Sequence, residues 1–332
     1  FTHVASNLGT SWGNPTGTGL ISAEYTFEGI AAHSAVAPWR GRSAVDALEL
    51  MDIGWNFRRE HLDPAQRSHY VIVDGGDQPN VVPPTATVWY YVRELTPDKV
   101  RENYATLHRI AEGAALMTDT TMRRRVVGSA WPQHYNRPIA LAMDENVKAV
   151  GLPAWSEDDQ VFARALQRLL DVEEKGLPTE LVGLRAPSGR TESSGSDDIG
   201  DVSWSVPTVT LRFPSNVDGM IPHHWSSAMA MATPIAHKGA TAGAKVVATT
   251  LLDLLQDENL RTEARRYFRE EQLGSTAYEP FIGADDAPPV EKNADIMAAF
   301  RERQRAFYYD PSKYPTYLEQ LGIDYPQLER PR

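Results

Sequence analysis

The sequence predicts an α/β protein that contains a ferredoxin-like βαββαβ unit. Two observations support this prediction: apolar residues alternate in four short segments, and they recur at helical spacing in two longer ones. The segments follow one another in the order strand, helix, strand, strand, helix, strand, which is the order of the split ferredoxin-like unit. Residues 20–130 are therefore expected to form one folded unit.

Six elements make up this predicted unit. Strands are expected at residues 21–29, 69–73, 86–93 and 121–129, and helices at residues 42–61 and 98–117. In the first strand Tyr25 and Phe27 fall on one face, and in the first helix Ala44, Leu48 and Met51 recur at helical spacing. These apolar positions are the predicted core.

The chain on either side of this unit has a different character. Residues 1–19 are rich in Gly, Ser and Thr and are predicted to be irregular, whereas residues 131–273 are predicted to be mainly helical. Within the later segment we expect helices at 138–150 and 157–170, a loop at 171–198, and one or two buried strands at 202–213. Residues 228–255 are mostly small and apolar and are expected to end in a helix at 242–255. Residues 274–332 are predicted to form a C-terminal extension draped over the surface. Since an α/β sheet needs more strands than these, we expect the missing ones to precede Phe1.

The composition restricts the class of function. The 332 residues carry a net charge of −11 and include no cysteine, so a nucleic-acid surface, disulfides and thiolate metal sites are not expected. No apolar run approaches the roughly 20 residues of a membrane span, and no signal peptide opens the chain. We therefore expect a cytoplasmic protein that binds neither nucleic acid nor membrane, and that holds any metal through His, Asp or Glu.

Three polar residues within the unit are candidates for chemistry. His33 follows the first strand among small residues, which leaves room for a ligand. Asn80 stands in a Gly/Pro-rich turn, and Arg93 closes the next strand; an amide and a guanidinium fork suit a carboxylate. The alternatives are a loop histidine bonded to a carbonyl, a turn asparagine and a surface ion-pair arginine.

Histidines and aspartates gather later in the chain. His223 and His224 are adjacent, and His237 follows them. Neutral imidazole is a common zinc ligand, although adjacent side chains usually point apart. Three further acidic residues in a Gly/Ser turn could form a hard-cation loop or could cap a helix or turn: Asp197, Asp198 and Asp201.

The first residues contain a competing motif. Residues 9–13, GTSWG, match the G-x-S-x-G nucleophile elbow of serine hydrolases. That elbow requires a strand before the serine and a helix after it. The residues that follow here, NPTGTG, cannot start a helix, so the serine-hydrolase interpretation is disfavoured.

Five segments together are more specific than any single motif: HSAVAPWRGRSAVDA, NVVPPTATVWYYVR, IAEGAALMTDTT, SDDIGDVSWSVPT and AHKGATAGAKVVATT. On these segments the chain resembles the aminoacylase/carnosinase family of zinc peptidases, and in particular its members that cleave p-aminobenzoyl-glutamate. The resemblance covers residues 20–256. It implies that residues 20–130 are a lid domain, inserted into a zinc-peptidase-type α/β catalytic domain whose C-terminal part is residues 131–273.

The resemblance also implies roles for the candidate residues. His33 matches the lid histidine that reaches into the neighbouring subunit of a homodimer and polarises the scissile carbonyl. Asn80 and Arg93 match residues that hold the carboxylate of an N-acyl amino acid substrate. His223 matches the C-terminal metal ligand, with His224 as the alternative, and His237 matches a site-lining residue. The family binds two metal ions, and zinc or manganese is implied.

The sequence departs from the family in one large respect. The His-x-Asp motif, bridging acid and Glu-Glu pair of the family lie upstream of its lid, and none appears here. We therefore expect a full-length form to hydrolyse the amide and this chain by itself to be inactive. The alternative is a non-catalytic dimerisation or ligand-binding fragment. Upstream coding sequence for the two missing motifs would decide between them.

Overall fold

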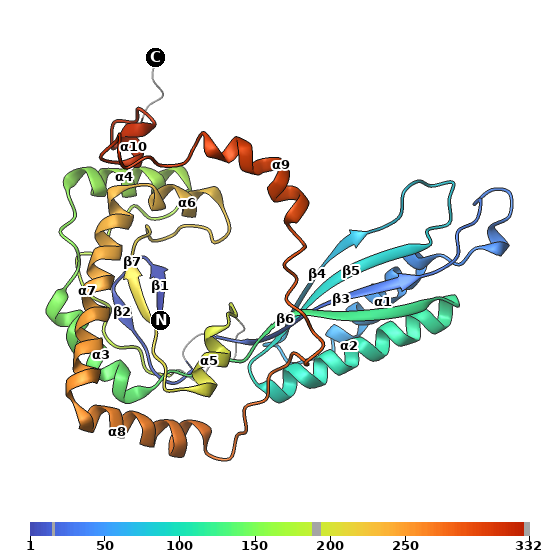
Figure 1. Cartoon of the computed structure of the whole chain (residues 1–332), viewed down its shortest axis with the longest axis horizontal. Helices are drawn as coiled ribbons and strands as arrows, with labels where there is room; N and C mark the ends of the chain where they lie inside the picture. The colour runs from blue at the N-terminus through green and yellow to red at the C-terminus, as the bar shows by residue number, and fades with distance from the viewer. Residues whose placement is uncertain (15–16, 188–193, 329–332) are drawn as a thin grey trace.

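The computed structural model describes residues 1–14, 17–187 and 194–328 and contains two units (Figure 1). One unit is elongated and consists of an antiparallel sheet with two long helices along one face. In the other unit several helices surround a small sheet. The C-terminal part of the chain passes the joint between the two units and ends beyond the second unit.

The elongated unit contains a four-stranded antiparallel sheet in the order β4-β5-β3-β6. Its elements are β3 (Gly19–Glu28), α1 (Ala44–Arg59), β4 (Arg67–Asp74), β5 (Thr85–Glu94), α2 (Pro97–Thr118) and β6 (Thr121–Ala130). Every helix and strand predicted between residues 20 and 130 is present. Ser43 and Thr96 precede the two helices, and their side chains accept hydrogen bonds from backbone N–H groups of the first turns, which fixes where the helices begin.

The core of this unit lies between the sheet and the two helices. Tyr25 and Phe27 of β3 and Leu48 and Trp55 of α1 are fully buried there, at positions that the strand and helix spacing predicts. The Trp55 Nε1 donates to Ser68 Oγ at 2.8 Å, so the buried indole N–H is paired. Burial of one large apolar side chain stabilises a fold by about 1.5–3 kcal/mol, so this core holds the unit together.

The small sheet of the second unit has the strand order β1-β7-β2. Strand β1 (Thr2–Ala5) runs parallel to β7 (Leu211–Pro214), and β2 (Gly9–Thr10) runs antiparallel to it. The prediction that residues 1–19 are irregular is therefore wrong for these two strands. Both are too short to show an alternating pattern, and they are defined by pairing with a distant segment of the chain.

A second correction concerns residues 202–213, for which the sequence predicts one or two buried strands. Helix α5 (Ile199–Ser205) occupies the first part, and β7 starts only at Leu211. A short apolar run does not separate a buried strand from a buried helical turn. The helix lies close to the end of β6, since a Cβ on Gly200 would lie 1.8 Å from the Trp131 carbonyl oxygen. Only glycine permits that approach.

The remaining helices are η1 (Pro38–Arg40), α3 (Arg137–Val150), α4 (Glu157–Leu169), α6 (Trp225–Met231), α7 (Pro234–Gln256), α8 (Glu258–Arg266), the π-helical η2 (Tyr267–Leu273), α9 (Ala294–Arg305) and α10 (Tyr317–Gln320). The predicted helices at 138–150 and 157–170 are α3 and α4. The helix predicted at 242–255 lies within α7, which begins earlier, at Pro234. None of the helices in the described ranges is long and apolar enough to cross a membrane.

The C-terminal extension contacts both units. Near the joint, the ring of Phe281 stacks on Trp131 with 5.7 Å between centroids, and Trp131 Nε1 donates to the Glu279 carbonyl oxygen at 2.7 Å. Helix α9 then crosses the gap between the units and buries none of its residues. Beyond it, the Tyr325 hydroxyl donates to Asp159 Oδ1 of α4 at 3.1 Å. The C-terminal extension therefore contacts the rest of the protein near both of its ends.

Candidate active site

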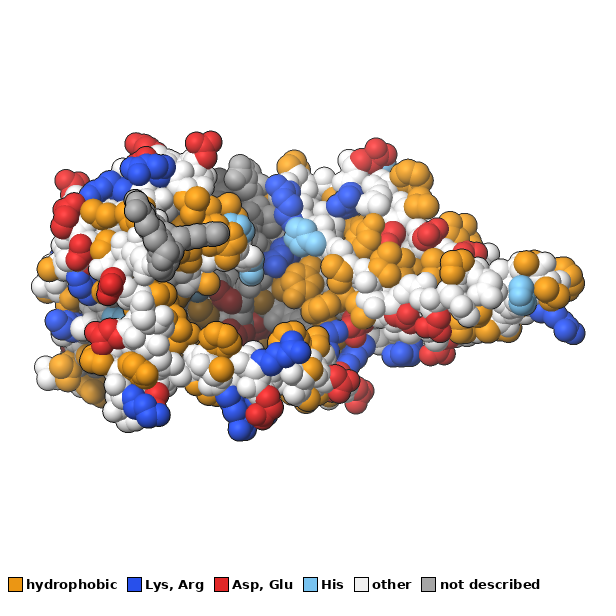
Figure 2. Space-filling view, turned by 90° about the horizontal axis from the view of Figure 1, so that it is seen from above, with side chains coloured by type: hydrophobic (Ala, Val, Ile, Leu, Met, Phe, Trp, Pro, Cys, Tyr) orange, Lys and Arg blue, Asp and Glu red, His pale blue; other side chains and the backbone are white. Residues whose placement is uncertain are grey.

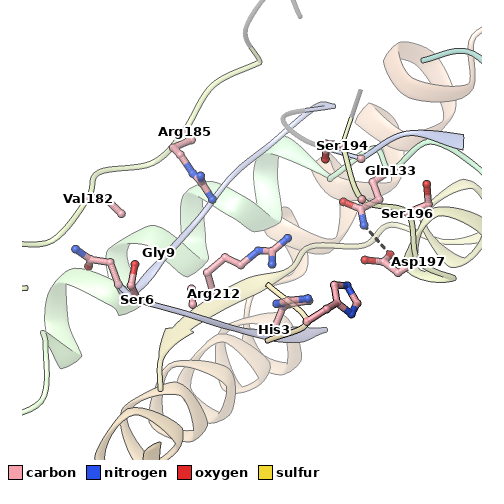
Figure 3. Close-up of a pocket in the computed structure, with 15 residues that line it drawn as sticks. His3, Ser6, Gly9, Gln133, Val182, Arg185, Ser194, Ser196, Asp197 and Arg212 are labelled. Atoms are coloured by element: carbon pink, nitrogen blue, oxygen red, sulfur yellow. Dashed lines mark hydrogen bonds between the residues drawn. The ribbon is translucent and has the colours of Figure 1, made fainter. Parts of the chain in front are cut away.

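A pocket of about 630 Å³ lies on the small sheet of the second unit (Figure 3). Its walls come from β1, β2 and β7, from Gln133 in the turn after β6, and from residues 182–185 and 194–197. Figure 2 shows arginine, lysine and histidine side chains around the hollow between the two units. The pocket has the size of a small-molecule site.

The register of the small sheet places the charged residues of this pocket. Arg212 on β7 is the neighbour of His3 on β1 and of Gly9 on β2. Register partners project from the same face of a sheet, so Arg212, His3 and Gly9 share one face. Burial lowers the pKa of Arg212. Neither His3 nor Arg212 was a candidate from the sequence, because their proximity depends on strand pairing.

A hydrogen-bonded chain forms the wall of the pocket toward the joint. Asp197 Oδ1 accepts from Gln133 Nε2 at 2.6 Å and from the backbone N–H of Ile199 at 3.1 Å. Gln133 Oε1 in turn accepts from the Tyr135 hydroxyl, and burial raises the pKa of Tyr135 to about 12. Asp197 therefore caps a turn, which is the structural role that the sequence left open for it.

Arg93 reaches this pocket from the elongated unit. Its Nη1 donates to Ser196 Oγ at 2.8 Å, and Ser196 lines the pocket. The guanidinium also lies over the Tyr91 ring, 5.4 Å from its centroid. Arg93 is half-buried, and this burial lowers its pKa. Of the residues proposed from the sequence for substrate binding, Arg93 is the one beside the pocket.

His33 and Asn80 lie together at the opposite end of the elongated unit. The backbone N–H of Ser34 donates to the Asn80 carbonyl oxygen at 3.0 Å, and His33 forms a β-bridge with Val81. Both side chains are exposed. Strand β5 separates them from Arg93, and the eight residue steps from Thr85 to Arg93 span ~27 Å. One chain thus cannot bring His33 to the pocket that Arg93 contacts.

The three later histidines occupy different places. His223 lines the pocket and has a φ of +59°, a left-handed conformation that is uncommon outside glycine. His224 caps α6, where its Nδ1 accepts from the Ser226 N–H at 3.4 Å. His237, near the start of α7, lines a separate depression with Lys238. The structure therefore places His223 in the pocket and directs His224 toward α6.

The residues present do not complete a metal site. Within the described ranges, no group of three or more histidine, aspartate and glutamate side chains is arranged to hold a metal ion. Asp201 accepts from the Trp131 N–H at 3.1 Å and from the Tyr278 hydroxyl at 2.9 Å, so it joins α5 to the chain around it. Burial raises the pKa of Asp201. His223 alone does not form a catalytic zinc site, which needs three protein ligands.

The nucleophile-elbow motif has no support in the geometry. Ser11 is buried and lies in a β-bridge with Arg185. Over the described part of residues 11–28 the chain contains no helix, and β3 follows. The helix that the elbow needs after its serine is therefore missing from that stretch.

Comparison with known proteins identifies the family. The family described as peptidase dimerisation domain matches residues 17–116. One of the subunits of the p-aminobenzoyl-glutamate hydrolase of Escherichia coli is 35% identical over 270 residues, which cover 74% of this chain and 56% of that protein. Residues 17–116 are thus a domain of the M20 peptidase family. The chain is also 27% identical over 259 residues to the Xaa-Arg dipeptidase of Mus musculus, covering 76% of this chain and 52% of that protein.

A solved structure agrees with this fold. The chain matches a putative aminohydrolase from methicillin-resistant Staphylococcus aureus with a TM-score of 0.51 and 16% sequence identity, over 77% of this chain and 58% of that one. The chain therefore spans little more than half the length of the relatives it matches. The relatives are amide and peptide hydrolases, and the M20 family is generally metal-dependent.

Proposed function

We propose that the chain is part of a metal-dependent amidohydrolase that cleaves an N-acyl amide bond next to a carboxylate, as in p-aminobenzoyl-glutamate. The observation that carries the proposal is the approach of Arg93 to the pocket, where it bonds Ser196 at 2.8 Å. A guanidinium offers a planar fork of donors that matches a carboxylate. The similarity to part of a p-aminobenzoyl-glutamate hydrolase supports the same class of substrate.

We propose further that residues 20–130 form a ferredoxin-like lid through which two copies dimerise. The match of residues 17–116 to a peptidase dimerisation domain supports this role. Strand β4 is an edge of the sheet and carries exposed apolar residues: Val71, Ile72 and Val73. An exposed apolar edge strand is a ready surface for pairing with another strand. In such a dimer the lid of one copy covers the pocket of the other.

The dimer gives His33 and Asn80 a role that one chain cannot provide. Both lie far from the pocket of their own chain, on an exposed tip of the lid. In the partner's pocket the His33 side chain would donate a hydrogen bond to the oxygen of the scissile carbonyl as charge develops there. Asn80 would orient the substrate beside it. Arg93 stays at the pocket of its own chain and holds the substrate carboxylate.

His223 is the residue of this chain that we propose as a ligand of the metal. Its place in the pocket supports the assignment. The family resemblance suggests two ions, zinc or manganese, which when bound would lower the pKa of a water molecule. The further ligands and the general base are not among the matched residues of this chain. His237 remains a proposed site-lining residue only.

The test is an assay of the protein translated from its complete reading frame. With zinc or manganese present, it should release p-aminobenzoate from p-aminobenzoyl-glutamate. Loss of a charge-assisted bidentate contact costs about 1.5–3 kcal/mol, so Arg93→Gln should raise KM by about 10- to 100-fold. Arg301→Gln removes the same charge from the exposed surface of α9 and should change nothing. Absence of hydrolysis with either metal would favour the non-catalytic alternative.

A further inference from the structure

We propose that Arg185 and Arg212 form a second carboxylate subsite, which selects substrates whose amino-acid part is acidic. The inference rests on the proposed function, because it assigns the side-chain carboxylate of a glutamate-like substrate to the same pocket. Arg93 then takes the carboxylate next to the scissile amide. Two separate cationic positions predict a dicarboxylate, and one position alone would accept any N-acyl amino acid.

The small sheet positions Arg212 in the pocket. Arg212 stands on β7, the central strand of the small sheet, with Gly9 as its register partner on one side. Gly9 and Arg212 both line the pocket. A Cβ on Gly9 would lie 3.3 Å from Val182 Cγ2, so the missing side chain lets Val182 pack closely against β2. The sheet thus presents Arg212 at the floor of a cavity with room for a ligand.

Arg185 lines the same pocket from a different wall. Its backbone is tied to the edge of β2, where its N–H donates to the Thr10 carbonyl oxygen and its own carbonyl accepts from the Trp12 N–H, both at 3.2 Å. Figure 3 shows the Arg185 and Arg212 side chains extending into the pocket from different walls. The two guanidinium groups are close enough that the charge of Arg185 contributes to lowering the pKa of Arg212, after burial.

The charges of Arg185 and Arg212 also favour an anion in the pocket. Across the described ranges, neither guanidinium has a hydrogen bond or an ion pair to a protein side chain. Asp197 is the carboxylate among the described residues that line the pocket; its charge acts to raise the pKa of Arg212, but its Oδ1 already accepts from Gln133 and from a backbone N–H. Arginine stays charged at neutral pH. Two like charges in a partly buried pocket are unfavourable until an anion occupies the space between them.

Arg93 contacts the same pocket through Ser196. Ser196, which accepts from Arg93, lines the same pocket as Arg185 and Arg212. A single ligand can therefore contact the lid arginine at one end and the arginine pair at the other. The pocket volume of about 630 Å³ accommodates an N-acyl glutamate. The two carboxylates of such a ligand account for all three arginines.

The experiment compares two ligands that differ only in the second carboxylate. Isothermal titration would measure binding of N-acetylglutamate and of N-acetylglutamine to the 332-residue chain. We expect tighter binding of N-acetylglutamate, and we expect Arg212→Gln and Arg185→Gln each to raise its Kd about tenfold or more without changing that of N-acetylglutamine. Arg93→Gln should weaken both ligands, and the exposed Arg301→Gln neither. Arg185 lies on an exposed loop, so its variant tests the proposal even if Arg212→Gln fails to fold.

Several results would overturn the proposal. Equal affinity for the two ligands, no binding of N-acetylglutamate, or arginine variants that keep the preference would each do so. Displacement of both ligands by inorganic phosphate to the same extent would indicate an unselective anion site instead. The outcome is separable from that of the proposed function. If the chain binds N-acetylglutamate selectively but the complete protein hydrolyses neither ligand type, the subsite stands and the proposed hydrolase activity fails. If the complete protein hydrolyses both ligand types at equal rates, the hydrolase activity stands and the subsite fails.

Discussion

Asp52→Asn should stabilise the lid unit at high pH and remove part of its pH dependence. Asp52 lies on α1 and is 7% exposed. The Tyr90 hydroxyl donates to its Oδ1 at 2.5 Å. Burial raises the pKa of Asp52 from 3.8 to about 6. The neutral amide keeps an oxygen that can accept from Tyr90, and it avoids the cost of a buried charge.

The direction of the pH dependence of stability follows from the difference in proton binding between the folded and unfolded states. The folded protein holds the Asp52 proton more tightly than the unfolded chain, so this carboxyl stabilises the fold below pH 3.8 and loses that contribution as pH rises through 6. The difference between the two pKa values corresponds to about 3 kcal/mol. Most of this difference in the free energy of unfolding should be seen between about pH 4 and pH 8. The variant should therefore gain about 2–3 kcal/mol relative to the parent across that range.

Urea unfolding at several pH values would measure this difference, with Trp55 in the same core as a fluorescent probe. Asp46→Asn makes the same chemical change at an exposed site of the same helix and controls for the substitution itself. A parallel pair of pH curves for Asp52→Asn and the parent would refute the reasoning. It would mean that the Tyr90 hydrogen bond offsets the burial of the charge.

Three further predictions concern the site and its assembly. In the complete protein, His33→Ala should lower kcat by about 10²–10³-fold, with unchanged metal content by elemental analysis; loss of metal would assign His33 to a different role. Ile72→Lys should leave the complete protein monomeric in light scattering, because a charge on the edge strand opposes pairing; a persistent dimer would place the interface elsewhere. Phe281→Ala should speed proteolysis of the extension beyond residue 274, since it removes the stacking on Trp131, whereas an unchanged digestion pattern would show that this contact does not anchor it.

The sequence predicted the helices and strands of the elongated unit well because these elements are long and their patterns are local. Alternation in β3 and helical spacing in α1 come from one buried face each. Arg93 was also a sequence candidate, because strand ends are places where side chains meet a neighbouring segment. His33 and Asn80 were both candidates, but their separation from Arg93 by the length of β5 becomes visible only in the folded sheet.

The arginine pocket could not be predicted in the same way. Arg212 and His3 become neighbours through the parallel pairing of β1 with β7, which are strands of four residues far apart in the chain. Arg185 joins them through an isolated bridge to Ser11. No periodic pattern marks such contacts. For the same reason residues 1–19 looked irregular and α5 looked like a strand.

The C-terminal extension bears on the same pocket through the joint between the units. The joint is where Arg93 of the lid meets Ser196, and where Trp131 meets both Asp201 and Phe281. Farther along the extension, Lys292 pairs with Glu24 on β3, and its ammonium lies 4.2 Å from the centroid of the Trp89 ring on β5. At the other end, Tyr325 bonds Asp159 of α4 in the second unit. A segment fixed to the lid at one end and to the second unit at the other resists their separation. The distance from Arg93 to the Arg185 and Arg212 pair therefore depends on residues that lie outside the pocket.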